Sequence, residues 1–344
     1  MKVLVISIFS FLFSFHCFSK FLAADRPLKV FILCGQSNME GHAKISTIEA
    51  MKMDPVTRPI YKQMVDLKGN PITCEKVWIS YFTGGRDNMG EGSGKLTAGY
   101  GSRRVPAEMG EKIGPEFTFG IYAQKALKEP ILIIKTAWGG KSIHTDFRPP
   151  SAGPYLFNEN EIENFKRRGK NINEIKADKA EQTGRFYRLM MDHVKKVLSD
   201  IKRVYPDYNQ KKGYELAGFA WFQGWNDMVA SGTYPNRGQP GGYDAYTDCL
   251  AHFIRDVRKD LNAPKMKFVI GVMGVGGPLE KYASPRYVPI HGNFRNAMAA
   301  PAIMPEFKGN VFAVRTAKFW DMRLKVLEDN QERVKQMAGF LKNK

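Results

Sequence analysis

The hydrophobic positions of the chain form short, mostly apolar runs separated by longer segments of helical periodicity. The runs lie at residues 30–34, 130–137, 216–222, 268–273 and 310–317. The run at residues 30–34 shows no alternation of apolar and polar residues, which indicates a strand buried on both faces. Residues 130–137 predict a second buried strand, and the other three runs predict further strands. Apolar residues at helical spacing predict helices over residues 113–127, 185–204 and 243–261, and a charged helix from residue 322 to the end.

Strands that alternate with helices at this spacing predict an α/β fold, with helices on both faces of a parallel sheet. We therefore expect a three-layer α/β/α sandwich with a five-stranded parallel sheet. Residues 43–114 lack clear periodicity and contain several prolines and a glycine-rich stretch, so we expect a long loop insertion that forms one wall of a substrate cleft. Residues 145–183 are also expected to be loop, and residues 290–298 a loop that leads into a short helix.

The first three predicted strands each end in glycine and polar residues. Gly35 to Gly41 contain Ser37, Trp138 to Lys141 contain two glycines, and Gln223 to Asp227 follow the third strand. Right-handed crossovers place the carboxyl ends of parallel strands at one edge of a sheet, where α/β folds bind ligands. Together with the loops after Met273 and Ala317, we expect these segments to form one pocket. Ser37 is its candidate nucleophile, although the stretch alone fits a helix cap equally well.

The first 24 residues have the form of a secretory signal. A basic start precedes an apolar segment that reaches Phe18, and Leu22-Ala-Ala supplies small residues for cleavage. This segment is short for a membrane span, and no later segment is long and apolar enough for one. We therefore expect a secreted or periplasmic protein without stable membrane insertion after cleavage, in which residues 25–344 form a single domain.

Cysteine content and charge narrow the classes of function. Cys34, Cys74 and Cys249 follow the signal, with no CxxC motif or Cys/His cluster, so we expect neither a disulfide framework nor a metal site. A Cys74–Cys249 pair stays open, and Cys34 is expected to be a buried thiol. The net charge of +18 is spread along the chain, without a nucleic-acid-binding motif. An acidic glycan partner or a solubility surface explains this charge better than nucleic acid. The sequence does not indicate the oligomeric state.

Three blocks together resemble a known family. Gly35-Gln-Ser-Asn-Met39, Gly139 and Gly224-Trp-Asn-Asp227 are similar, in order and position, to the blocks of the SGNH hydrolase superfamily. They resemble in particular its branch of sialate O-acetylesterases and carbohydrate acetylesterases. The resemblance covers roughly residues 28–317. It implies a flavodoxin-like fold and a serine esterase that removes O-acetyl groups from carbohydrate through an acetyl-serine intermediate, without a cofactor or metal.

The resemblance also implies roles for single residues. Ser37 would be the nucleophile, and the backbone N–H groups of Ser37 and Gly139 would bind the oxyanion together with a side-chain amide. The wider superfamily points to Asn226 for this amide and the acetylesterase branch to Gln223, so both stay candidates. Residues beside these blocks are the expected substrate contacts: Gln36, Asn38, Gly140, His144 and Asp227. For Asp227, turn formation is the alternative.

The catalytic base is where the chain departs from the family. The family places a histidine after the fifth strand, whereas this chain has none after His291. Three explanations stay open: a further segment that carries the histidine, an inactive glycan-binding protein, or His291 or His144 as the base. His193 lies on an apolar helix face and His252 within a helix, so we expect both to be structural.

Overall fold

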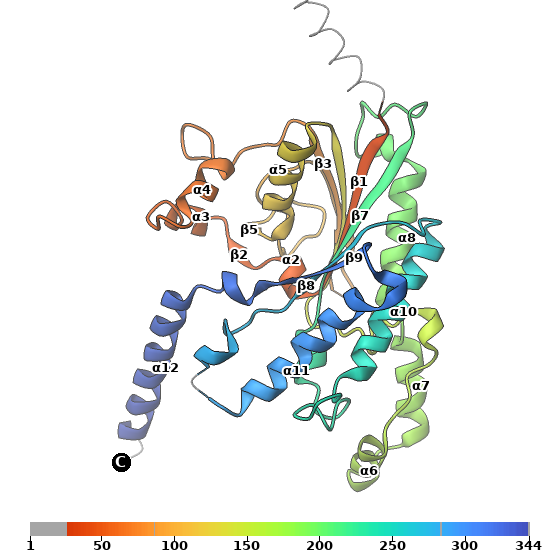
Figure 1. Ribbon diagram of the computed structural model, residues 1–344, viewed down its shortest axis with the longest axis vertical. Helices are drawn as coiled ribbons and strands as arrows, with labels where there is room; N and C mark the ends of the chain where they lie inside the picture. Colours follow the sequence, from red (N-terminus) through yellow and green to blue (C-terminus); the bar gives the residue numbers. More distant parts are fainter. Residues whose placement is uncertain (1–25, 86, 283, 343–344) are drawn as a thin grey trace, which may run out of the picture. The chain divides into compact units, whose positions relative to one another are not determined.

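The computed structural model describes residues 26–85, 87–282 and 284–342, so the expected signal segment lies outside the described residues. Its central sheet has seven strands in the order β4-β3-β6-β1-β7-β8-β9 (Figure 1). The strands are β1 (Leu28–Gly35), β3 (Val77–Thr83), β4 (Gly90–Lys95), β6 (Ile131–Ala137), β7 (Tyr214–Phe222), β8 (Phe268–Val272) and β9 (Val311–Arg315). β3 pairs parallel with β6, and β8 with β9, whereas β4 pairs antiparallel with β3.

Helices connect and flank these strands. The α-helices are α2 (Ser37–Glu40), α3 (Thr47–Ala50), α4 (Arg58–Met64), α5 (Pro115–Leu127), α6 (Glu159–Arg167), α7 (Ile172–Gln182), α8 (Arg185–Ser199), α9 (Trp225–Val229), α10 (Asp244–Asp260), α11 (Tyr287–Ala299) and α12 (Met322–Lys342). A two-stranded antiparallel sheet pairs β2 (Ala43–Lys44) with β5 (Lys112–Ile113). The mostly parallel α/β fold with flanking helices is the predicted class.

All five predicted strands are present, as β1, β6, β7, β8 and β9. The predicted helices are present as α5, α8, α10 and α12, and α8 ends at Ser199 rather than near residue 204. β1 is buried along most of its length and lies in the middle of the sheet, which agrees with its uniformly apolar sequence. Unbroken apolar runs were therefore a sufficient signal for the buried strands.

The expected loop insertion over residues 43–114 is wrong, and so is the expected number of strands. This segment contains β3 and β4, which bring the central sheet to seven strands. β3 is buried almost throughout, whereas β4 has the sequence Gly-Glu-Gly-Ser-Gly-Lys and little intrinsic strand preference. β4 forms because its backbone pairs with β3 over six consecutive residues. Pairing with a partner, rather than local propensity, determines its structure.

Two other expected loops are helical. Residues 145–183 contain α6 and α7, and residues 290–298 lie within α11. Asn158 caps α6: its side chain accepts a hydrogen bond from the backbone of Glu161, whose carboxylate in turn accepts one from the backbone of Asn158. Asn171 caps α7 in a similar way. An asparagine followed three residues later by glutamate is the sequence signal for such helix starts.

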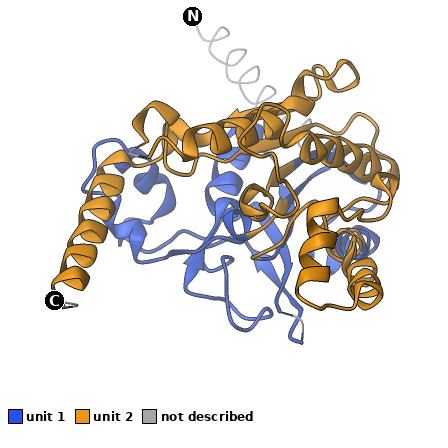
Figure 2. Cartoon of the chain, turned by 90° about the horizontal axis from the view of Figure 1, so that it is seen from below, with its two compact units in different colours: residues 1–33, 37–138, 192–219 blue, residues 34–36, 139–191, 220–344 orange. Residues whose placement is uncertain are grey.

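The chain divides into two compact units, which Figure 2 shows in different colours. Unit 1 comprises residues 1–33, 37–138 and 192–219, and unit 2 comprises residues 34–36, 139–191 and 220–344. In unit 1, α5 packs against β3 and β6, and in unit 2, α11 packs against β8 and β9. The organisation of residues 25–344 as one domain stays a prediction.

Further expectations concern cysteines and membrane spans. Cys34 and Cys249 are buried, and Cys74 and Cys249 do not form a disulfide. Within residues 26–342, apart from the two undescribed positions, no helix has the length and apolar character that a membrane crossing requires.

Candidate active site

Ser37 lies in unit 1, at the start of the short helix α2 that follows β1. The Gly41 N–H donates to the Ser37 carbonyl at 2.9 Å, and the Gly41 carbonyl accepts from the Ser102 N–H at 2.7 Å. Gly41 has φ +89°, and a Cβ atom there would lie 2.1 Å from the Gly114 Cα. The residue therefore has to be glycine, because a side chain would meet both backbone strain and a clash. This close approach fixes the end of the turn that carries Ser37.

Lys135 of β6 makes hydrogen bonds that hold the same turn in place. Its ammonium donates to the Glu40 carbonyl at 2.9 Å, to the Tyr100 carbonyl at 2.8 Å and to the Glu116 carboxylate at 2.5 Å. The side chains of Lys135 and Glu116 are fully buried. All three ammonium hydrogens therefore have acceptors, as a buried lysine requires. Because Glu40 ends α2, this network ties the Ser37 helix to β6 and α5.

A pocket of about 460 Å³ opens beside Ser37 in unit 1. Ser37, Asn38, His42 and Thr118 contribute its polar side chains. Methionine, isoleucine and proline side chains supply most of the remaining wall: Met51, Met64, Ile113 and Pro115. Asn38 is exposed, as a substrate contact has to be. This pocket is large enough for a small-molecule group such as one sugar unit.

His42 is a residue of this pocket that the sequence analysis did not single out. Its Nε2 lies 3.5 Å from the Glu40 carboxylate, and about half of its side chain is exposed. The signal in the sequence was its position five residues after Ser37, in the turn that the glycines already marked. His42 is therefore a further candidate for contact with a ligand in this pocket.

In unit 2, Gln36 orients the residues that follow β7. Its Oε1 accepts hydrogen bonds from the backbone N–H groups of Gly224 at 3.0 Å and Asn226 at 3.3 Å. Its Nε2 donates to the Asn226 Oδ1 at 2.8 Å. The two backbone donors fix which end of the Gln36 amide is oxygen, and this in turn fixes the Asn226 amide. Gln36 is 1% exposed, so it acts as a support, and a direct substrate contact stays a prediction.

These bonds distinguish the two candidate amides for the oxyanion. The Gln223 Nε2 donates to the Gln36 Oε1, to the Lys141 carbonyl at 3.0 Å and to the Asp227 carboxylate at 2.5 Å, so its hydrogens are engaged. The Asn226 Nδ2 has no hydrogen-bond partner among the described residues, and its side chain is half-buried. Asn226 therefore has a donor available for a ligand, whereas Gln223 serves the internal network.

Asp227 joins the segment after β7 to the segment after β6. Its carboxylate accepts from the backbone N–H groups of Ile143 at 2.9 Å and His144 at 3.1 Å, and from the Tyr234 hydroxyl at 3.1 Å. The side chain is fully buried. Burial raises its pKa to about 6, against the lowering effect of these hydrogen bonds. Asp227 thus forms the turn, which was the alternative expectation, and its role as a substrate contact stays a prediction.

Gly139 and Gly140 follow β6 in unit 2. Both glycines are exposed, and Gly140 has φ +75° with open space where a Cβ would lie. The N–H of Gly139 has no backbone partner among the described residues. An exposed, unpartnered N–H beside the Asp227-bound loop is the kind of donor that an oxyanion site uses.

His144 and His291, the two candidate bases, both contact a tyrosine hydroxyl in unit 2. The Tyr282 hydroxyl donates to the Val275 carbonyl at 2.5 Å and accepts from Arg295 at 2.8 Å. Its contact of 2.8 Å with the His291 Nδ1 therefore needs a hydrogen on Nδ1, since the single hydroxyl hydrogen is already used. His291 is left with a basic Nε2, and burial, with Arg295 nearby, lowers its pKa to about 4.

His144 has a similar arrangement. Its Nδ1 lies 3.3 Å from the Tyr234 hydroxyl, which donates to Asp227. Burial, with Arg148 and Lys179 nearby, lowers its pKa to about 4. Both histidines are consequently neutral at physiological pH, which is the form that can accept a proton.

His193 and His252, which were expected to be structural, each contact a serine hydroxyl. His193 is buried, and its Nε2 lies 2.9 Å from the Ser80 hydroxyl, which donates to Glu91 at 2.7 Å. The histidine must therefore donate to the serine, so it does not activate it. His252 contacts the Ser151 hydroxyl through Nδ1 at 2.8 Å. In the part of the chain that the structure describes, no group of three His, Cys, Asp or Glu side chains has the geometry of a metal site.

Comparison with known proteins places these features in a family. Residues 27–288 match the family model described as "Carbohydrate esterase, sialic acid-specific acetylesterase". This match covers more than half of the chain, and the protein therefore belongs to this family of carbohydrate esterases. The resemblance seen in the blocks around Ser37, Gly139 and Asn226 is thereby confirmed at the level of the family.

Solved structures give weaker likenesses. A protein from Arabidopsis thaliana, solved by X-ray crystallography, has 15% identity over 84% of this chain and 85% of its own, with a TM-score of 0.41. A carbohydrate acetylesterase from Xanthomonas citri has 14% identity over 83% of this chain and 49% of its own, with a TM-score of 0.42. Comparison with curated proteins found no significant match. The family assignment therefore rests on the family model.

Proposed function

We propose that this carbohydrate esterase hydrolyses O-acetyl esters on a glycan through an acetyl-enzyme on Ser37. The family match over residues 27–288, which includes the Ser37 block, is the observation that carries the proposal. The Ser37 oxygen would attack the acetyl carbonyl carbon while a base removes its proton. The sugar oxygen would leave with that proton, and water would then cleave the acetyl-serine to acetate.

Stabilisation of the oxyanion is assigned to Gly139 and Asn226, with the Ser37 N–H as the third donor. The available amide of Asn226 and the unpartnered N–H of Gly139 support this assignment. Each such donor lowers the barrier by about 3 kcal/mol in comparable sites. Gln223 is assigned a supporting role, because its amide hydrogens are already bound.

The base in this proposal is His291, with His144 as the second candidate. The Tyr282 hydroxyl holds the Nδ1 hydrogen of His291 and leaves Nε2 as the proton acceptor, which is the tautomer that a general base needs. The variants His291→Ala and His144→Ala separate the candidates. Replacement of the true base should lower the rate of hydrolysis by several orders of magnitude, whereas replacement of the other histidine should not.

Export to the periplasm or the outside of the cell is also part of the proposal, and rests on the basic start and apolar segment of residues 1–24. The substrate would then be an extracellular acetylated carbohydrate. Mass spectrometry of the N-terminus of protein recovered from the culture medium or periplasm tests this point. An uncleaved N-terminus on cytosolic protein would contradict it.

Hydrolysis of p-nitrophenyl acetate and release of acetate from an acetylated xylan test the activity. We expect Ser37→Ala to reduce both rates by at least about a thousandfold. Ser199→Ala, a substitution at an exposed helix position, should leave both rates unchanged. Equal rates for wild type and Ser37→Ala would exclude Ser37 as the nucleophile. An inactive wild type that still binds the glycan saturably would support the inactive glycan-binding alternative.

A further inference from the structure

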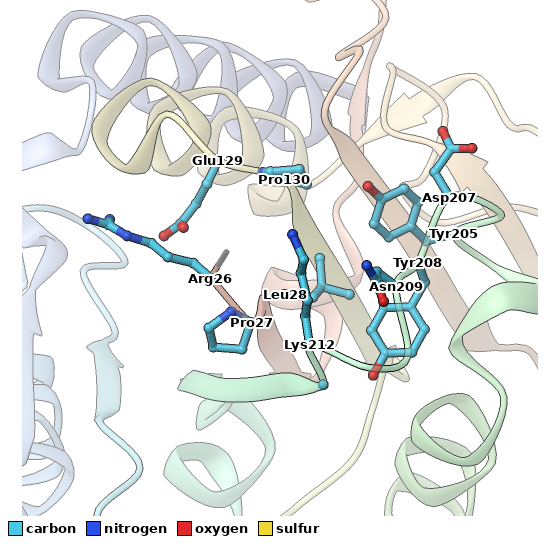
Figure 3. Close-up of a pocket in the computed structure, with 11 residues that line it drawn as sticks. Arg26, Pro27, Leu28, Glu129, Pro130, Tyr205, Asp207, Tyr208, Asn209 and Lys212 are labelled. Atoms are coloured by element: carbon cyan, nitrogen blue, oxygen red, sulfur yellow. The ribbon is translucent and has the colours of Figure 1, made fainter. Parts of the chain in front are cut away.

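We propose that unit 1 contains an accessory binding site for a neutral sugar unit, separate from the pocket beside Ser37. The site is a pocket of about 280 Å³ at the opposite end of the strands (Figure 3). Leu28 begins β1, Pro130 precedes β6 and Gly213 precedes β7, and all three line this pocket. Since β1 has eight residues at about 3.3 Å each, the pocket lies roughly 25 Å from Ser37.

Glu129 is the residue that marks this pocket as a binding site. It lies in the loop between α5 and β6 and is only 6% exposed. Its carboxylate has no hydrogen bond or ion pair within the described structure, although it lines the pocket. The carboxylate is not among the fully buried polar atoms that lack a partner, so its oxygens keep contact with solvent. Acceptor oxygens that line a pocket and have no internal donor can accept hydrogen bonds from a ligand. A ligand with hydroxyl groups would supply the missing donors.

The other side of the pocket offers aromatic surface and further polar groups. Figure 3 shows the Tyr205 and Tyr208 side chains across the pocket from Glu129, with Asn209 beside them. The Tyr205 ring stacks on Trp78 with ring centroids 4.0 Å apart, which holds the ring in place. The Asn209 Oδ1 accepts from the Lys211 N–H at 3.0 Å, so its amide hydrogens remain for a ligand.

The charges of the lining select the class of ligand. Arg26 and Lys212 are balanced by Glu129 and Asp207, so the pocket carries no net formal charge. A balanced lining attracts neither an anion nor a cation over long distances. A pyranose fits the combination of rings, acceptors and donors, because it has an apolar C–H face and a rim of hydroxyl groups. The volume of about 280 Å³ lies just below the range of about 300–1,000 Å³ for small-molecule sites and suits one sugar unit.

This inference rests on the proposed function for the view that the sugar belongs to the glycan substrate. The accessory pocket would then retain one part of a glycan chain on the enzyme while another part reaches Ser37. Such a second contact raises the effective concentration of the polymer at the active site without changing the chemistry. Small esters such as p-nitrophenyl acetate would not use it.

Titrations with three probes test the site: methyl β-D-xylopyranoside, methyl β-D-galactopyranoside and N-acetylneuraminic acid. We expect saturable, millimolar binding of at least one neutral glycoside. Saturation-transfer NMR and the tryptophan fluorescence of Trp78 monitor this binding. Glu129→Ala and Tyr208→Ala should each weaken it about tenfold. Ser37→Ala should bind as wild type does, which separates this site from the proposed esterase chemistry.

Matched controls are Glu108→Ala and Tyr122→Ala, which change exposed residues outside the pocket and should leave binding unchanged. Glu129→Ala should also leave the melting temperature unchanged or raise it, because its carboxylate makes no internal bond. A lowered melting temperature would instead indicate a structural role. Absence of binding by both neutral glycosides, preference for N-acetylneuraminic acid, or undiminished binding by both pocket variants would overturn the proposal.

Discussion

Each of the two units of this esterase contains a polar network around a buried ionisable side chain, and the two networks compensate the burial differently. In unit 1, Lys135 beneath the Ser37 turn is paired with the opposite charge of Glu116. In unit 2, Asp227 beneath the segments after β6 and β7 is surrounded by neutral donors. Burial lowers the pKa of Lys135 while Glu116 opposes the shift, and burial raises the pKa of Asp227 to about 6. We therefore expect the charge pair of unit 1 to contribute mainly to the free energy of unfolding. We expect Asp227 in unit 2 to make this free energy depend on pH.

The largest expected effect is on stability, from breaking the paired network. Lys135→Met leaves Glu116 buried without its partner and should lower the free energy of unfolding by about 3–5 kcal/mol. The surface pair of Lys95 and Glu75 is a matched control, since Lys95→Met should cost less than about 1 kcal/mol. Urea denaturation measures both.

A second variant keeps this prediction testable if Lys135→Met does not fold. The double variant Lys135→Met/Glu116→Leu removes both charges and should regain most of the lost stability. If the single and double variants were equally unstable, the contacts of Lys135 with the backbone of α2 and Tyr100, rather than the charge pair, would be responsible.

The next largest effect is on catalysis, and it tests whether the amide of Asn226 or that of Gln223 donates to the oxyanion. Asn226→Ala should lower kcat by about a hundredfold to a thousandfold with little change in stability, because it removes a proposed oxyanion donor. Gln223→Ala should mainly lower stability, because it removes one of the donors to Asp227 and the side-chain donor to the Lys141 carbonyl. Kinetics with p-nitrophenyl acetate and thermal melts distinguish the two. The reverse pattern would assign the oxyanion to Gln223.

The smallest expected effect is a pH dependence of the stability, which arises from Asp227 and its neutral hydrogen-bond donors. The folded-state pKa of Asp227 lies above its ordinary value, so between about pH 4 and 6 the folded state binds more protons than the unfolded one. Stability should therefore fall as the pH rises through this window, by up to about 3 kcal/mol relative to Asp227→Asn. Unfolding of both proteins at pH 4, 5, 6 and 7 measures this difference. If the stability of the wild type relative to Asp227→Asn rose with pH between 4 and 6, the raised pKa would be contradicted.

Sequence patterns identified the parts of the fold that are apolar and continuous. The strands β1 and β6 were predictable because most of their residues are buried, and β7 because its apolar residues form a continuous run. β4 was not, because its glycine-rich sequence forms a strand only through pairing with β3. The capped helices α6 and α7 were missed although their asparagine caps are visible in the sequence.

The site shows the same limit. Motif order gave Ser37, Gly139 and Asn226 as candidates, but the networks around these residues depend on contacts between distant residues. Lys135 is the one charged residue of β6, and this was the available signal for its network. The proposed preference for Asn226 over Gln223 depends on the hydrogen bonds of Gln36, which joins residues almost two hundred positions apart.

The most direct test of the central claim is to trap the acetyl-enzyme. Wild-type protein mixed with p-nitrophenyl acetate is quenched in acid, digested and analysed by mass spectrometry. The account predicts one acetyl group on Ser37, absent from Ser37→Ala. Hydrolysis by the wild type without acetylation of Ser37, or with the acetyl group on another residue, would contradict it.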